Sequence, residues 1–235
     1  MKYAYAALGL AALLIAGPVV AQPATPHAAT PADFAPEIAK FAEMDALVSP
    51  PACGFLFVGS SSIRFWRSLG YDMAPYAVIN RGFGGAKIRD VNFYFDKVVA
   101  PYHPRAIFFY AGENDLWAGA KAEDVVADFQ QFLDLKTKAL GNTPVYFISL
   151  KPSKQRLAQF ELQSQVNAKF KAMDRARADL SYVDVVPIMR DRGTPKEVFV
   201  ADGLHMTPEG YGLWTKVVRP VVERNVMSKQ ICAKP

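Results

Sequence analysis

The stretch GFLFVGSSSIRFW, residues 54–66, joins an apolar run to a helical pattern through a glycine and three serines. The run from 54 to 58 is continuously apolar, which is typical of a parallel strand buried on both faces. A glycine followed by serines is typical of a turn that starts a helix. The stretch therefore predicts a strand, a tight turn and a helix, and it raises the question of whether one serine is a nucleophile.

The same alternation continues along the chain. Further apolar runs, rich in β-branched and aromatic residues, predict strands at 76–80, 106–111, 144–150 and 181–186. Helical patterns separate them at 62–69, 88–99, 122–140 and 156–178, and a last helix follows Pro208. This order predicts an α/β fold, a three-layer α/β/α sandwich with a five-stranded parallel sheet and functional loops at the carboxyl ends of the strands.

The first 21 residues have the features of a secretory signal peptide. Lys2 is followed by an apolar stretch, and Val19-Val20-Ala21 forms a small-residue cleavage site. An uncleaved membrane anchor is the alternative, but Pro18 interrupts the apolar helix. We therefore expect export to the periplasm or the extracellular space and a mature chain that starts at Gln22.

The remainder is long enough for one well-buried domain. Residues 22–32 are rich in Pro, Ala and Thr and predict a linker, so we expect a single domain over residues 33–235. The net charge of +5 becomes +4 without Lys2, and the basic residues are scattered. Such a charge pattern does not indicate nucleic-acid binding, and no stable membrane insertion is expected once the signal peptide is cleaved.

Cys53 and Cys232 are the two cysteines of the chain. Because export leads to an oxidising compartment, a disulfide between them is permitted. It would connect the start of the domain to its last residues. Two unpaired thiols are the alternative.

Polar or glycine-rich loops follow the predicted strands. Their sequences are GSSS (59–62), NRGFGGAK (80–87), GEND (112–115) and KPSKQR (151–156), while DGLH (202–205) precedes the last helix. Because the carboxyl ends of parallel strands share one edge of a sheet, these loops are expected to meet. Ester hydrolysis through a covalent intermediate needs a hydroxyl nucleophile, a base, a group that orients the base and oxyanion donors. The loops offer candidates for each.

Only three histidines are candidates for the base. His27 lies in the linker, and His103 precedes the third strand at the opposite edge of the sheet. His205 lies at the loop-bearing edge, and Asp202 is placed to hold its imidazole. Taken alone, this Asp-x-x-His pattern also fits a capping aspartate beside an exposed histidine. No second histidine or paired cysteine is placed to complete a zinc site, so no metal is predicted.

The glycine and asparagine loops are also open to more than one interpretation. The RGFGGA segment fits neither the dinucleotide fingerprint nor the P-loop, although nucleotide binding there stays an alternative. A glycine also lets a backbone N–H approach an oxyanion closely. Asn114 is ordinarily a turn former, but beside the other loops its amide becomes a further oxyanion donor.

Four of these loop sequences, in this order, resemble the four sequence blocks of the SGNH/GDSL hydrolases, and the resemblance extends over about residues 53 to 225. FVGSSS resembles the first block, NRGFGGAK the second, GEND the third and DGLH the last. The resemblance selects Ser61 as the nucleophile, with Asp202 and His205 as its triad partners, and leaves Ser60 as a helix cap. It implies an oxyanion hole made of Ser61, Gly85 and Asn114. The family fold is flavodoxin-like, with strand order 2-1-3-4-5.

Two positions depart from the usual family pattern. Ser60 stands where the family usually has aspartate, and Ala86 stands where it often has aspartate or serine. Neither departure removes a catalytic group, so both bear on subfamily and substrate.

The resemblance implies a carboxylic ester hydrolase that forms an acyl-serine and needs no cofactor. Trp117 and Lys151 are candidates for a substrate pocket, and Arg156 is a further basic residue on the same loop as Lys151. Because no long insertion separates the blocks, we expect an open site for short acyl groups, and hence a small ester or acylated carbohydrate as substrate. Thioesterase or lysophospholipase activity and a non-catalytic glycan-binding module are the alternatives.

Overall fold

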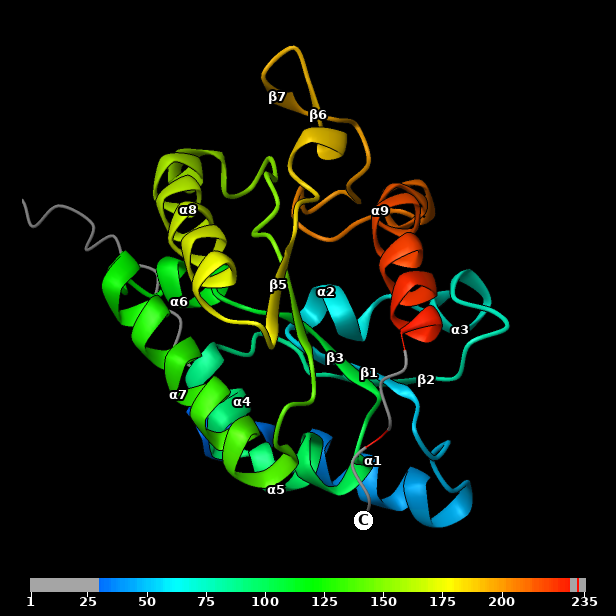
Figure 1. Cartoon of the computed structure of the whole chain (residues 1–235). Helices are drawn as coiled ribbons and strands as arrows, with labels where there is room; N and C mark the ends of the chain where they lie inside the picture. Colours follow the sequence, from blue (N-terminus) through cyan, green and yellow to red (C-terminus); the bar gives the residue numbers. More distant parts are fainter. Residues whose placement is uncertain (1–29, 229–231, 233–235) are drawn as a thin grey trace, which may run out of the picture.

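The computed structural model describes residues 30–228 and residue 232, and its centre is a five-stranded parallel sheet (Figure 1). The strand order is β2-β1-β3-β4-β5, as predicted. The strands are β1 (Phe55–Gly59), β2 (Val78–Gly82), β3 (Ala106–Tyr110), β4 (Val145–Ile148) and β5 (Leu180–Val183). The predicted three-layer sandwich is thereby confirmed. The predicted signal peptide and the linker up to residue 29 lie outside the described residues.

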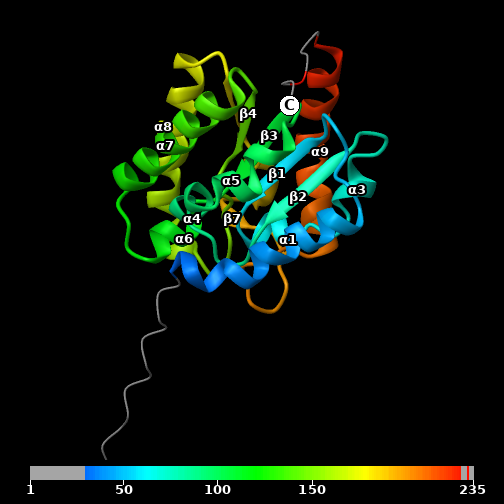
Figure 2. The ribbon, with the colours of Figure 1, turned by 90° about the horizontal axis from the view of Figure 1, so that it is seen from below.

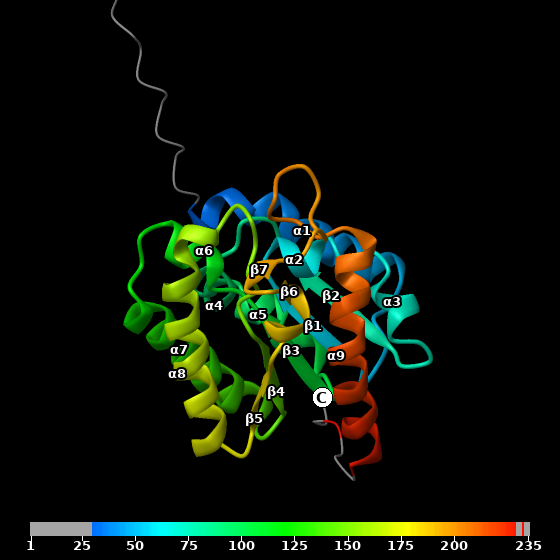
Figure 3. The same ribbon diagram turned by 90° about the horizontal axis from the view of Figure 1, so that it is seen from above.

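Helices cover both faces of the sheet (Figure 3). One face packs against α1 (Ala35–Leu47), α4 (Ile88–Phe93), α5 (Phe95–Val98), α7 (Ala122–Leu140) and α8 (Phe160–Ala176). The other face packs against α2 (Ser61–Arg64), α3 (Leu69–Asp72) and α9 (Pro208–Met227). Shorter elements are η1 (Pro31–Phe34), η2 (Ala100–Tyr102), α6 (Glu113–Trp117), η3 (Leu157–Gln159), η4 (Pro187–Met189), β6 (Arg190–Asp191) and β7 (Thr194–Pro195).

The continuous apolar run at 54–58 is explained by the position of β1 at the centre of the sheet. Leu56 and Val58 belong to the core on one face, whereas Phe55 and Phe57 belong to the core on the other. Phe57 pairs in register with Phe108 of β3, and their rings stack with centroids 4.6 Å apart. Both faces of the strand are therefore shielded from water, so neither face requires polar residues.

Two predicted helices are interrupted. The pattern at 62–69 forms α2 and α3 with a break between them, where Trp66 turns into the core and packs edge-on against Phe57 and Trp214. The pattern at 88–99 forms α4 and α5, which are separated at Tyr94. Local periodicity marks the apolar face of each segment, but the insertion of a large ring into the core decides where the helix ends.

The ends of the domain are fastened to the sheet. Arg81 of β2 forms an ion pair with Asp45, which places α1 along the β2 edge (Figure 2). A disulfide joins Cys53, just before β1, to Cys232, with the Cα atoms 5.6 Å apart. In the described residues, no helix is both long and apolar enough to cross a membrane.

Candidate active site

Ser61 lies at the sharp turn between β1 and α2. The chain leaves β1 at Gly59, whose φ of +138° and close approach to the Tyr110 carbonyl leave no room for a side chain. Ser60 donates its N–H to the same carbonyl at 2.8 Å and occupies the N-cap position of α2. Its side chain makes no capping hydrogen bond. Ser60 therefore has the predicted N-cap position but not the side-chain hydrogen bond of a cap. Ser61 is the first helical residue, whose N–H has no intrahelical acceptor.

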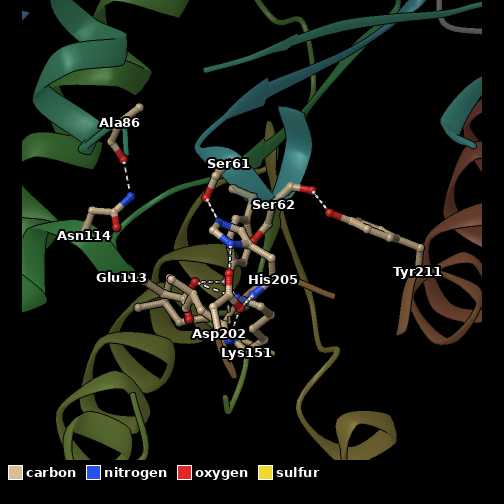
Figure 4. Close-up of polar contacts among 12 residues, drawn as sticks. Ser61, Ser62, Ala86, Glu113, Asn114, Lys151, Asp202, His205 and Tyr211 are labelled. Atoms are coloured by element: carbon tan, nitrogen blue, oxygen red, sulfur yellow. Dashed lines mark hydrogen bonds and ion pairs between the residues drawn. The ribbon is translucent and has the colours of Figure 1, made fainter. Parts of the chain in front are cut away.

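The structure brings Ser61, His205 and Asp202 into one hydrogen-bonded chain (Figure 4). His205 Nε2 lies 2.9 Å from Ser61 Oγ, and His205 Nδ1 lies 2.5 Å from Asp202 Oδ2. An ionised carboxylate can only accept, so Nδ1 carries the ring proton and Nε2 accepts from the serine hydroxyl. This is the arrangement in which an imidazole removes a proton from a nucleophile.

Asp202 is held in this orientation by its own loop. Its Oδ1 accepts the backbone N–H groups of Leu204 at 2.8 Å and of His205 at 2.9 Å. Partial burial by itself would raise the pKa of the Asp202 carboxyl, but these two N–H groups and the imidazole hold that pKa below its usual value. The carboxylate therefore stays charged and keeps the imidazole in one tautomer.

The imidazole is also packed against an aromatic ring. Phe65, which follows α2, meets His205 edge-on, with ring centroids 4.9 Å apart and an interplanar angle of 89°. The residue that directly follows the nucleophile's helix thus also supports the base.

The loops after β2 and β3 lie against each other beside Ser61. Asn114 Nδ2 donates to the Ala86 carbonyl at 3.0 Å, which leaves the second amide hydrogen of Asn114 for another acceptor (Figure 4). Gly85 has a φ of +77°, and a Cβ built there would meet no atom within 4 Å. This conformation suits glycine, and no other side chain covers that position. The Asn114–Ala86 hydrogen bond therefore brings two of the predicted oxyanion residues, Gly85 and Asn114, onto neighbouring segments.

Lys151, predicted to line a substrate pocket, is instead fully buried. Its Nζ lies 2.8 Å from Glu113 Oε2 and 3.3 Å from the Tyr110 hydroxyl, which itself donates to Glu113 at 2.5 Å. Burial, followed by the neighbouring Glu113 carboxylate, raises the pKa of Tyr110 well above its usual value, so the phenol stays protonated. The Lys151 ammonium group therefore points into the core, where it pairs with the buried Glu113 carboxylate. Without this lysine, Glu113 would be a buried carboxylate with no cation beside it.

Trp117 and Arg156 lie together at the outer side of this cluster. Trp117 is 55% exposed as a residue, as a pocket wall would be. The Arg156 guanidinium covers it, with its central carbon 3.7 Å from the ring centroid. Trp117 therefore remains a candidate for substrate contact, whereas Lys151 does not.

Sequence reasoning missed the buried group formed by Tyr110, Glu113 and Lys151. Glu113 and Lys151 follow the neighbouring strands β3 and β4, so opposite charges directly after adjacent strands were a usable signal. Among the described residues, no three His, Cys, Asp or Glu side chains are grouped so that they would hold a metal ion. His103 lies before β3, at the edge of the sheet away from Ser61.

The comparisons with known proteins place this chain in one class, the hydrolases of the GDSL/SGNH type. The profile described as the GDSL-like Lipase/Acylhydrolase family matches residues 58–213, which include Ser61, Gly85, Asn114, Asp202 and His205. The match covers more than half of the chain, and the chain belongs to this family of hydrolases. Among curated proteins, none matches the chain in sequence.

Solved structures share the fold at low sequence identity. A GDSL-like lipase from Bacteroides thetaiotaomicron has a TM-score of 0.67 and 18% identity, over 80% of this chain and 97% of its own. A carbohydrate esterase family 3 protein from Talaromyces cellulolyticus has a TM-score of 0.61 and 14% identity, with coverages of 75% and 100%. An acetyl-xylooligosaccharide esterase from Geobacillus stearmophilus has a TM-score of 0.60 and 12% identity, with coverages of 79% and 99%. At these identities the likeness concerns the fold alone.

Proposed function

We propose that this protein is an exported serine esterase that hydrolyses short-chain acyl esters, acetyl esters above all, through an acyl-serine intermediate. The observation that carries the proposal is the hydrogen-bonded chain from Ser61 Oγ through His205 to Asp202, at 2.9 and 2.5 Å. A simple helix cap needs neither the imidazole nor the carboxylate behind it. The signal-peptide features of residues 1–21 support export.

The proposed reaction has two halves. Ser61 Oγ attacks the ester carbonyl carbon while His205 Nε2 takes the hydroxyl proton, and the carbonyl oxygen becomes an oxyanion. The backbone N–H groups of Ser61 and Gly85 and the free amide hydrogen of Asn114 donate to this oxygen. Collapse of the intermediate breaks the bond to the alcohol, which leaves with the proton from His205. Water, activated by the same imidazole, then releases the acid and restores Ser61.

The preference for short acyl groups rests on the open surroundings of the site. No long insertion separates the four motif blocks, and the side chains of His205 and Asp202 are 26% and 45% exposed. Two proteins of similar fold are named as a carbohydrate esterase and an acetyl-xylooligosaccharide esterase, which favours an acetylated carbohydrate as the natural substrate. Thioester or lysophospholipid hydrolysis would use the same steps.

Labelling with a fluorophosphonate probe tests the proposal directly, because the probe reacts with an activated serine hydroxyl. The native protein and Ser60→Ala should be labelled, and Ser61→Ala should not. Ser60→Ala is the matched control, since it removes a neighbouring hydroxyl in the same turn. An unlabelled native protein would favour the non-catalytic glycan-binding alternative. Hydrolysis of p-nitrophenyl esters from acetate to decanoate, and of a short acyl thioester, then measures the acyl and thioester preference.

A further inference from the structure

Arg156 is a buried cation without an anion beside it. Arg156 is 6% exposed, and two of its three guanidinium nitrogens, Nε and Nη1, are buried and donate no hydrogen bond to the protein. Within residues 30–228 and 232, no carboxylate forms an ion pair with it. The other fully or nearly buried lysine and arginine residues, Arg81, Lys136 and Lys151, each pair with a carboxylate. Arg156 therefore stands apart from them.

The stacking on Trp117 does not satisfy the guanidinium. A cation over an indole face contributes about 0.5 to 2 kcal/mol, but the N–H groups lie in the plane of the guanidinium and point past the ring. Burial lowers the pKa of Arg156, and the nearby Glu113 charge only partly opposes this. Glu113 is not a direct partner, because its Oε2 accepts from Lys151 and Tyr110. Nε and Nη1 of Arg156 thus keep unused donors, and Nη2 is the guanidinium nitrogen that is not among the buried unpaired atoms.

Arg156 also lies between the two loops that carry the proposed catalytic groups. The preceding residue, Gln155, donates its N–H to the carbonyl of Gly203, within the loop from Asp202 to His205. Trp117 ends α6, the short helix that also contains Asn114. Gln159 anchors the same region by donating its side-chain amide to the Leu116 carbonyl at 3.1 Å. The segment that carries Arg156 is therefore hydrogen-bonded both to the loop of Asp202 and His205 and to α6.

We propose that Arg156, supported by the Trp117 ring, binds a carboxylate of the substrate, so that the preferred substrates are esters that carry a carboxylate close to the scissile bond. This inference rests on the proposed esterase function and deepens it. A carboxylate supplies two acceptor oxygens and a charge, which match the planar donors of a guanidinium better than a single sugar hydroxyl does. Stacking on Trp117 holds the guanidinium plane in one orientation before the substrate arrives.

The experiment compares two pairs of matched esters. Mono-p-nitrophenyl glutarate and p-nitrophenyl butyrate differ by a carboxylate on the acyl half, whereas 4-acetoxybenzoate and its methyl ester differ by a carboxylate on the alcohol half. The quantity measured is the ratio of kcat/KM for the charged ester to that for its neutral match. In the native protein this ratio should exceed about 10 in one of the two pairs, since a hydrogen bond to a charged group contributes about 1.5 to 3 kcal/mol. The pair that shows the preference identifies the half of the ester that faces Arg156.

Two variants and one control assign the preference to Arg156. Arg156→Gln should lower the ratio at least tenfold, and Arg156→Lys should lower it less, because the charge remains but the planar donors do not. Lys154→Gln removes an exposed cation from the same loop and should leave the ratio unchanged. Thermal unfolding of each variant shows whether it is folded. If Arg156→Gln does not fold, the comparison of Arg156→Lys with the native protein is the test.

The outcomes separate this inference from the esterase proposal. A native ratio near 1 in both pairs, or a preference that survives both Arg156 variants, would overturn the carboxylate site while leaving the esterase intact. Equal losses on charged and neutral esters in both variants would also overturn it, since they indicate a structural role. If the native protein hydrolyses none of the four esters and takes up no fluorophosphonate, the esterase proposal itself fails.

Discussion

Asn114 donates its side-chain amide to the carbonyl of Ala86 at 3.0 Å, which joins the loop after β3 to the loop after β2. The next residue, Asp115, strengthens the connection by accepting the N–H of Ile88 at 3.1 Å. Two proposed oxyanion donors, Gly85 and Asn114, are therefore positioned by direct contact between their loops. Such preorganisation is what oxyanion stabilisation requires, because the donors must be in place before charge develops.

Replacement of Asn114 by alanine should lower kcat for p-nitrophenyl acetate by about 10²- to 10³-fold, because one oxyanion donor is lost. Asn114→Asp is an isosteric companion variant. Its carboxylate cannot donate and repels the oxyanion, so its kcat should fall at least as far. An unchanged kcat in both variants would remove Asn114 from the oxyanion hole.

Replacement of Asp202 by asparagine should lower kcat by roughly 10³- to 10⁴-fold with little change in fold. The amide preserves the shape of the side chain but no longer stabilises a charged imidazole or fixes its tautomer. Asp191→Asn, at an exposed position of β6, is the matched control and should retain native kcat. If Asp202→Asn keeps the native rate, the carboxylate has no role in orienting His205.

Asp115 should make the stability of the protein depend on pH. The carboxyl group is fully buried, and burial raises its pKa from 3.8 to about 7, with the Ile88 N–H opposing the shift. The folded state therefore holds a proton that the unfolded chain releases near pH 4. The stabilisation is complete below that pH and is lost as the pH rises to about 7.

The measurement is the free energy of unfolding in urea at several pH values between 4 and 8.5, for the native protein and Asp115→Asn. Relative to the variant, the native protein should lose stability across this range by up to roughly 4 kcal/mol, since each pKa unit is worth about 1.4 kcal/mol. For Asp134→Asn, at an exposed position of α7, the free energy of unfolding should depend on pH in the same way as for the native protein. A constant difference between native and Asp115→Asn would show that Asp115 does not titrate in this range.

Replacement of Lys151 by methionine should destabilise the fold by about 3 to 5 kcal/mol, because it leaves the Glu113 carboxylate buried without its cation. Lys154→Met is the matched control on the same loop. Lys154 pairs with Glu197 at the surface, with side chains 47% and 82% exposed, so its loss should cost no more than about 1 kcal/mol. Equal effects of the two substitutions in urea unfolding would contradict the buried pairing of Lys151.

Loss of the disulfide should also destabilise the domain. The bridge between Cys53 and Cys232 spans 179 residues, and closure of so long a loop stabilises by up to about 5 kcal/mol on the chain-entropy model. Cys53→Ser should therefore unfold at a lower temperature than the native protein under oxidising conditions. A reductant should lower the native melting temperature toward that of the variant and leave the variant unchanged. A native melting temperature that does not respond to the reductant or to Cys53→Ser would show that the bridge contributes nothing.

The fold was predictable from the sequence because its main signals are local. Continuous apolar runs such as 54–58 indicate buried parallel strands, and the alternation with helical patterns leaves few topologies. The same alternation places the loops that contain Ser61, Asn114 and His205 at one edge of the sheet. Family resemblance, more than periodicity, selected Ser61 among three adjacent serines.

Only the tertiary structure decided which charged side chains face inward and which partners they meet. Lys151 and Arg156 are similar basic residues of one loop in sequence, yet Lys151 pairs with Glu113 in the core whereas Arg156 stacks on Trp117 beside the active-site rim. Periodicity reports how a segment alternates between core and solvent, but a loop has no period. The burial and pairing of its side chains depend on contacts between residues about 40 positions apart, and these exist only once the strands have assembled.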